Sequence, residues 1–237
     1  MLNTVYQLKR PRQFEVAFKE MEIDDRQVIV RPTRLSICHA DQRYYQGARA
    51  EEILRQKLPM ALIHEGIGKV IYDPTGTFEI GTEVVMIPNR PVEKDDIIAE
   101  NYLRSSKFCA SSMDGFLQEY VQAVPDRFVR LPQGINPTVA AYTELVSVSF
   151  HAINRFLRFS HERRDVIGVW GDGNLGYITS LLLKKMDQTP PQPSERHANL
   201  PGVGVQRLDY PKKAGAGQAR PHHAELPSGR KAHRKGG

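Results

Sequence analysis

The chain has 237 residues, of which 40% are hydrophobic and 25% are charged, the balance of a globular protein with a well-buried core. Its two cysteines, Cys38 and Cys109, exclude a disulfide framework of the secreted type and favour a reducing compartment. Residues 187–237 carry nine Lys or Arg against four Asp or Glu, a net +5 of the total +6. The first 186 residues are therefore close to neutral, and the high isoelectric point says little about their partners.

Up to about Leu131 the chain reads as short strands separated by proline and glycine. Residues 1–12 alternate apolar and polar side chains without the apolar core of a signal peptide, and no apolar stretch approaches membrane-spanning length. The sequence thus predicts a cytoplasmic protein with no membrane partner. The expected strands are residues 14–18, 27–31, 68–72, 83–87, 116–124 and 127–131, and their regular turn signals predict a mostly β, barrel-like domain.

From Pro137 the apolar residues recur every three or four positions, which predicts a helix that runs to about Phe159 and bridges two domains. Residues 165–170 form a short apolar run, followed by a glycine turn and by residues 177–186, which are rich in Leu and Ile. Strand, glycine turn and helix in this order open a doubly wound nucleotide-binding sheet, whose first helix receives a pyrophosphate at its N-terminus. The predicted cofactor loop comprises Gly171, Gly173, Asn174, Leu175 and Gly176.

Residues 187–237 break this pattern, with seven Pro, seven Gly and no Phe, Trp or Ile. Such a stretch cannot bury enough apolar surface to offset an ordering entropy of roughly 1–2 kcal/mol per residue, so we expect a disordered tail. An inert appendage is favoured over a basic segment that binds a subunit or nucleic acid. The abrupt change after Met186 indicates a reading-frame shift or an aberrant terminus, and translation of the other frames tests that hypothesis.

Residue types that can hold a catalytic zinc occur in the first 150 positions. Such a site needs three protein ligands and an open position, and Cys38, His64 and Glu144 are all accepted donors. Taken alone, a Cys or a His in an apolar setting is more often packing than a ligand. Asp41 fits two roles equally, as a partner that orients a ligand histidine or as an N-cap of the short helix that follows.

The surroundings of these residues resemble a known family. The strings at 36–41, 63–66 and 143–147 are similar to the successive zinc-site motifs of the medium-chain zinc-dependent dehydrogenase/reductase superfamily, and the glycine turn follows where that family places its cofactor domain. Within the superfamily the chain resembles the ribulose-5-phosphate reductases, which supply ribitol phosphate for CDP-ribitol and for polymers such as teichoic acid and capsule. That closer match, which reaches about residue 186, rests on strings at 12–16, 41–45, 57–60, 93–96, 98–102 and 170–177.

The resemblance implies an α/β chain in three parts. Residues 1–145 would form a GroES-like β-barrel catalytic domain that binds zinc. Residues 146–186 would supply a bridging helix and the truncated start of a Rossmann doubly wound sheet, and residues 187–237 the disordered tail. One strand and one helix cannot form a stable parallel sheet, so we expect this chain to bind zinc weakly or not at all and to have little reductase activity.

The chemistry that the resemblance implies is the reduction of D-ribulose 5-phosphate to D-ribitol 5-phosphate. One catalytic Zn²⁺ on Cys38, His64 and Glu144, with Glu65 as an alternate ligand, would polarise the ketone while NADPH delivers hydride. Asp41 would be the partner that fixes the ring orientation and basicity of His64. A homo-oligomer and a cytidylyltransferase that uses the product are the implied protein partners. The alternative is a non-catalytic fragment that acts only by association with a subunit or an anionic polymer.

Two departures from the family pattern leave roles open. Ala40 stands where many relatives have a Ser or Thr that begins a proton relay, so the proton donor is undetermined, and His39 is either a donor or a surface residue. Cys109 is the only cysteine in the lobe that holds a four-cysteine zinc in many relatives, so a second zinc is not expected. Arg43 and Arg49 are candidates for binding the substrate phosphate, although surface arginines are more often simply solvated.

Overall fold

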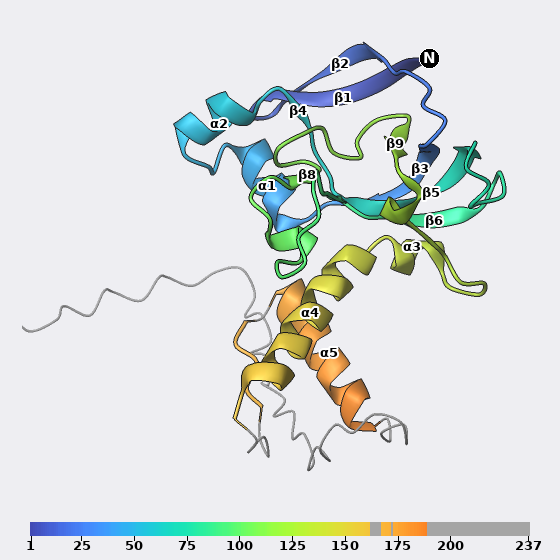
Figure 1. Cartoon of the computed structure of the whole chain (residues 1–237). Coiled ribbons are helices and arrows are strands. Elements are labelled where there is room, and N and C mark those ends of the chain that lie inside the picture. Colours follow the sequence, from blue (N-terminus) through green and yellow to red (C-terminus); the bar gives the residue numbers. More distant parts are fainter. Residues whose placement is uncertain (162–166, 172, 189–237) are drawn as a thin grey trace, which may run out of the picture. The chain divides into compact units, whose positions relative to one another are not determined.

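The structure, a computed structural model, describes residues 1–161, 167–171 and 173–188, and strands dominate its first 130 residues (Figure 1). The strands are β1 (Leu2–Arg10), β2 (Gln13–Glu20), β3 (Val28–Ser36), β4 (Met60–Ala61), β5 (Glu65–Tyr72), β6 (Glu83–Met86), β7 (Asn89–Arg90), β8 (Lys107–Phe108), β9 (Val121–Ala123) and β10 (Phe128–Arg130). They form three antiparallel sheets with the orders β2-β1-β4, β10-β6-β5-β3-β9 and β7-β8. The predicted mostly β domain is confirmed.

Among the described residues, two α-helices lie between strands and three follow the last strand. They are α1 (His39–Gln46), α2 (Glu51–Lys57), α3 (Pro137–Ala140), α4 (Thr143–Phe159) and α5 (Asn174–Gln188), with single 3-10 turns η1 (Glu100–Tyr102) and η2 (Pro125–Arg127). The helix predicted from Pro137 to Phe159 is confirmed except for a break at Ala141 and Tyr142, which separates α3 from α4. Among the described residues, no helix is both long enough and apolar enough to cross a membrane.

Valines make up half of the main buried cluster of the five-stranded sheet, and their β-branched side chains suit the half-covered surface of a pleated sheet. Removing one such side chain from water stabilises the fold by about 1.5–3 kcal/mol. Five expected strands coincide with β2, β3, β5, β6 and β10, whereas the strand expected over residues 116–124 is confined to β9. The main buried cluster comprises Val28, Val30, Val70, Val84, Met86, Cys109, Phe116, Val121, Ala123 and Phe128.

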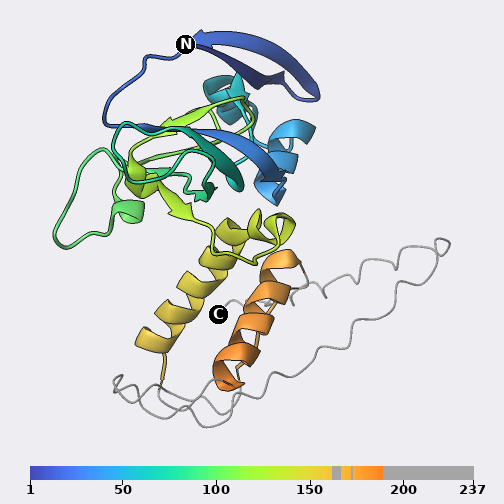
Figure 2. The same ribbon diagram turned by 90° about the vertical axis from the view of Figure 1, so that its right-hand side faces the viewer.

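Helices α4 and α5 lie side by side and share a small apolar core at Ile153 and Leu183 (Figure 2). The strand expected over residues 165–170 is not found in its described part, because residues 167–171 belong to no strand and the Trp170 side chain is fully exposed. A parallel strand exists only when a neighbour accepts its backbone hydrogen bonds, and none of the described strands lies beside this segment. The predictions for residues 189–237 lie outside the described residues.

Arg127 is a buried charged residue of the β-rich part that is paired with two carboxylates. Its side chain is only 8% exposed, and its guanidinium bonds Glu100 at 2.6 Å and Asp126 at 2.9 Å. These two carboxylates raise the pKa of Arg127, with the Asp126 hydrogen bond as the largest cause. The arrangement joins η1 to η2 and so fixes the long loop between β7 and β8.

Replacing Arg127 with Met should lower the free energy of unfolding by about 1–3 kcal/mol, because two carboxylates lose a partner that is itself removed from water. Arg26→Met is the matched control. Arg26 pairs with Asp24 and Asp25, but its side chain is 83% exposed, so no measurable change in the free energy of unfolding is expected. Urea denaturation of both variants measures the free energies of unfolding, and an equal loss of stability in the two variants would contradict the stabilising role of Arg127.

Candidate functional site

The candidate metal ligands come together because of the register between β3 and β5. These strands are antiparallel, and Ser36 at the end of β3 pairs with Glu65 at the start of β5. Cys38 follows Ser36 by two residues and His64 directly precedes Glu65, so both leave the sheet at the same end. The hydrogen-bond ladder thus brings together residues that are 26 positions apart in the sequence.

The ligand atoms of Cys38, His64 and Glu65 all lie within 4.8 Å of one another, the one such group of three or more among the described residues. The Cys38 Sγ and His64 Nε2 atoms are 3.7 Å apart. Tetrahedral zinc with ordinary Zn–S and Zn–N bonds would hold such atoms at about 3.5 Å. The donor set and the spacing therefore fit a single zinc ion without rearrangement of these two side chains.

Asp41 fixes the loop on both sides of this cluster. It is the third residue of α1, where Cys38 is the N-cap, so the alternative N-cap role for Asp41 is wrong by three positions. One carboxylate oxygen accepts the Cys38 N–H at 3.0 Å and the other accepts the Ile63 N–H at 2.8 Å. The Asp41 charge also raises the pKa of His64, which opposes the larger effect of burial.

Burial sets the protonation of the three clustered groups when no metal is bound. It raises the pKa of the Cys38 thiol to about 12 and lowers the pKa of His64. It also raises the pKa of Glu65, and the Asp41 charge adds to that effect while a hydrogen bond from Ser36 opposes it. A neutral imidazole can donate its lone pair directly, whereas the thiol must release its proton when a metal binds.

Glu144 lies close to the cluster but outside it. It is the second residue of α4, a helix that packs against β5, and it is half-buried. Burial, reinforced by the charges of Glu65 and Asp41, raises its pKa to about 7. Of the four predicted ligands, the structure thus groups Cys38, His64 and Glu65, while Glu144 is near enough to be affected by their charges.

Two further residues shape the site and were missed by sequence reasoning. Phe108 of β8 packs edge-on against the His64 ring, with ring centroids 5.3 Å apart. Ile63 has a φ of 71°, a left-handed conformation that is unfavourable for a β-branched residue. Neither feature can be predicted from the local sequence, because Phe108 is distant from His64 in the chain and the backbone of Ile63 is constrained by the tertiary structure.

The two phosphate-binding candidates differ in their surroundings. Arg43 is exposed, and its Nε and Nη2 atoms both donate to the Ala48 carbonyl at 3.4 Å. Arg49 is half-buried, and its guanidinium lies over the Tyr44 ring at 4.5 Å. The Arg49 Nε is buried and has no hydrogen-bond partner. His39, by comparison, is an exposed first residue of α1.

The described residues of the predicted cofactor loop lead directly into a helix. Gly171 has a φ of 135°, and a Cβ on Gly176 would come within 2.2 Å of the Gly171 carbonyl oxygen. Helix α5 then begins at Asn174, with Leu175 exposed and the Tyr177 N–H bonded to the Gly173 carbonyl at 3.0 Å. The helix N-terminus expected to receive a pyrophosphate is therefore formed.

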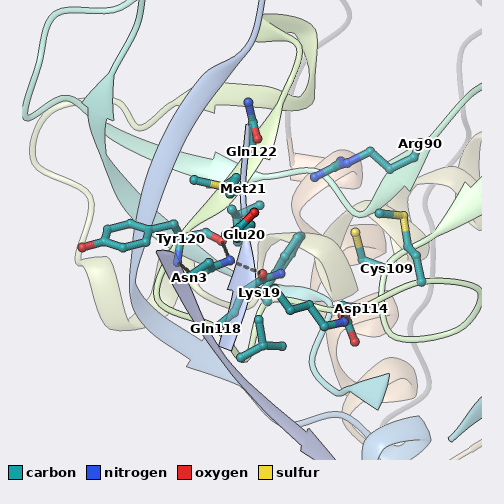
Figure 3. A pocket seen from close by; sticks show the side chains of 14 residues that line it. Asn3, Lys19, Glu20, Met21, Arg90, Cys109, Asp114, Gln118, Tyr120 and Gln122 are labelled. Carbon is teal, nitrogen blue, oxygen red and sulfur yellow. Dashed lines mark hydrogen bonds and ion pairs between the residues drawn. The ribbon is translucent and has the colours of Figure 1, made fainter. Parts of the chain in front are cut away.

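A separate cavity of about 220 Å³ lies between the β1–β2 hairpin and the loop around Cys109 (Figure 3). Its wall includes Lys19, Arg90 and Asp114, and none of the candidate metal ligands lines it. Burial lowers the pKa of Arg90, whose guanidinium donates to the carbonyls of Ile87 and Asn89. The cavity is thus distinct from the metal cluster.

Comparison with known proteins identifies relatives of this arrangement. Residues 24–133 match the alcohol dehydrogenase GroES-like domain. The chain is 60% identical over 185 residues to a ribulose-5-phosphate reductase of Bacillus spizizenii, covering 78% of this chain and 54% of the relative. It is 57% identical over 186 residues to ribulose-5-phosphate reductase 1 of Staphylococcus aureus, with the same coverage. The chain spans about half the length of the curated relatives it matches.

Solved structures show the same fold. The S. aureus TarJ structure in complex with NADPH has a TM-score of 0.63 and 48% identity, and the match covers 78% of this chain and 51% of that one. The L-idonate 5-dehydrogenase of Escherichia coli has a TM-score of 0.67 at 23% identity, covering 78% and 55%, which supports the fold alone.

Replacing Glu144 with Gln should stabilise the metal-free protein at pH 8. The folded-state pKa of about 7 lies above the ordinary value of 4.5, so an ionised Glu144 opposes folding at any pH above that ordinary value. The cost grows until the pH passes the folded-state pKa and reaches at most about 3 kcal/mol. Urea denaturation should therefore show the E144Q variant more stable at pH 8 and equal to wild type at pH 4.

Zinc should reverse this order, because a carboxylate near the ion stabilises the folded state and the amide does not. Glu52→Gln, a change at an exposed position of α2, serves as the control and should leave both measurements unchanged. A metal-free E144Q variant that is less stable than wild type at pH 8 would contradict the account.

Proposed function

We propose that the metal cluster of this chain, whose residues 24–133 match the alcohol dehydrogenase GroES-like domain, is the catalytic site of a zinc-dependent reductase. The proposed reaction converts D-ribulose 5-phosphate into D-ribitol 5-phosphate with NADPH, for CDP-ribitol and polymers such as teichoic acid or capsule. The supporting observation is the convergence of Cys38, His64 and Glu65 in a chain 60% identical to a ribulose-5-phosphate reductase over 185 residues. A cytidylyltransferase and a second copy of the chain are the proposed partners.

In this proposal the chain's own residues prepare the site. Cys38 and His64 hold the metal, and either Glu65 or Glu144 completes the set, with the other carboxylate close by. Asp41 holds the two loops that carry Cys38 and His64 at a fixed separation through its two backbone hydrogen bonds. Bound zinc would supply Lewis acidity at the C2 carbonyl, and bound NADPH would supply hydride.

A second carboxylate beside the ligand set has a chemical use. Burial raises the pKa of both Glu65 and Glu144, and the charge of Glu65 adds to that effect at Glu144. One of them can therefore keep its proton while the other is ionised. We propose that Glu65 and Glu144 alternate as ligands when water and substrate exchange.

The substrate phosphate is assigned to Arg49 rather than Arg43. Stacking on Tyr44 holds the Arg49 guanidinium in place, and its buried Nε lacks a partner. Arg43, by contrast, is exposed and already donates two bonds to Ala48. A phosphate oxygen can accept from an arginine whose donors are not used within the fold.

A specific observation favours a reduced activity for this chain as written. Residues 167–171 form no strand, and the Trp170 side chain is completely exposed beside the cofactor turn. Several apolar residues of α5, including Leu175, Tyr177 and Leu181, are also exposed. Such surfaces would be covered in a complete nucleotide-binding sheet, and here they support the second candidate function, a non-catalytic fragment that acts by association.

A chimaera separates the two candidates. Residues 1–186 joined to the remaining part of the B. spizizenii reductase should oxidise NADPH with ribulose 5-phosphate, and Cys38→Ser should abolish that activity. The unmodified zinc-loaded chain should be slower by about a hundredfold or more, because its cofactor is poorly positioned. Comparable rates for the chimaera and the unmodified chain would contradict the reduced activity proposed for this chain. A chimaera that reduces other ketoses but not ribulose 5-phosphate would contradict the proposed reaction.

Replacing Arg49 with Gln should weaken binding of ribulose 5-phosphate to the zinc-loaded chimaera by about tenfold, the loss of one charge-assisted hydrogen bond. Unphosphorylated ribulose should bind the variant and the wild type equally. Arg43→Gln is the matched control and should change neither affinity by more than about twofold. Calorimetry measures the affinities of the wild type and both variants for the two ligands, and an equal loss in the two variants would overturn the assignment of the phosphate to Arg49.

A further inference from the structure

The backbone that presents His64 is strained and must be held from outside. Ile63 adopts a φ of 71°, which is unfavourable for a β-branched residue and persists only where the surroundings impose it. Its N–H donates to Asp41 at 2.8 Å, which fixes one side of the residue. A second set of contacts fixes the other side.

This second set comes from the segment 114–117, which lies more than fifty residues later in the sequence. The N–H groups of Gly115, Phe116 and Leu117 donate to three successive carbonyls that precede His64. The acceptors are Ala61 at 2.7 Å, Ile63 at 2.6 Å and Leu62 at 3.2 Å. Three consecutive bonds determine where these carbonyls point and therefore how the chain enters His64.

Gly115 allows this close approach because it has no side chain. A Cβ at this position would lie 2.3 Å from the Ile63 carbonyl oxygen and 2.4 Å from that of Leu62. Both distances are far below van der Waals contact, and both atoms belong to the backbone. The Ala110 Cβ, at 2.8 Å, closes the third side.

Asp114 anchors the segment to the rest of the sheet. Its carboxylate accepts from the Ala61 N–H at 2.7 Å, from Gln7 Nε2 at 2.9 Å and from Lys19 Nζ at 2.5 Å. Figure 3 shows the Lys19 side chain reaching Asp114 at the edge of the cavity. The anchor therefore joins β1, β2 and β4 to the loop that carries His64.

We propose that the segment 114–117 is a positioning element of the metal site. Gly115 allows the close approach of the two backbones, and Asp114 anchors the segment. Together they hold Ile63 in its strained conformation and aim His64 at Cys38 and Glu65. This inference rests on the proposed function, because the aim of His64 matters only if the cluster binds a metal. Neither residue touches the metal or the substrate.

Titration of the full 237-residue chain with Co²⁺ tests this proposal, since the visible absorption of the ion reports both affinity and ligand geometry. Gly115→Ala should weaken Co²⁺ binding about tenfold or more and shift the absorption bands even at saturating metal, because the His64 ring is displaced. Gly168→Ala is the matched control, since a Cβ there meets nothing within 4 Å, and it should bind within about twofold of wild type.

Two further measurements distinguish a positioning role from a purely structural one. They are the melting temperature of the metal-free proteins and the Co²⁺ titration of a second variant. If Gly115→Ala does not fold, Asp114→Asn, which retains the size of the side chain and loses the Lys19 ion pair, should weaken Co²⁺ binding about three- to tenfold and shift the bands. Unchanged affinity and spectra in a folded Gly115→Ala variant, or in Asp114→Asn, overturn the inference. Wild-type chain that binds no Co²⁺ through a thiolate instead overturns the proposed function.

Discussion

The pairing of Ser36 with Glu65 between β3 and β5 is the constraint on which the site depends. It places Cys38 and His64 at the same end of two adjacent strands, although neither side chain belongs to a strand. A shift of one residue would move Glu65 to the opposite face of the sheet and carry His64 away from Cys38. The ladder itself is stabilised by a core of buried valines, so metal binding and folding share the same interactions.

The ligands are held by contacts from three separate parts of the chain. Asp41 ties α1 to Ile63, the segment 114–117 ties the loop to the first sheet, and Phe108 packs on the His64 ring. Each contact restricts the geometry before any metal arrives. A preformed site of this kind costs less ordering entropy on binding than a flexible one.

Local patterns in the sequence predicted the secondary-structure elements well, but they predicted few of the contacts between those elements. Period two predicted β2 and β3, short runs separated by proline and glycine predicted β5, β6 and β10, and the change of period at Pro137 predicted the helical segment. The ligand types were visible, but the sequence could not show that Glu65 would group with Cys38 and His64 while Glu144 stayed outside, because α4 docks through tertiary packing. The strand expected near Trp170 failed because a strand requires a partner, and the role of Gly115 depends on a loop fifty residues away.

X-ray absorption at the zinc edge of the zinc-loaded chain tests the central claim most directly. The account predicts a four-coordinate ion with one sulfur at about 2.3 Å and with nitrogen or oxygen at about 2.0–2.1 Å, since Cys38 is the one thiol in the cluster. A spectrum with no sulfur, or with two sulfurs because Cys109 has joined Cys38, would contradict it.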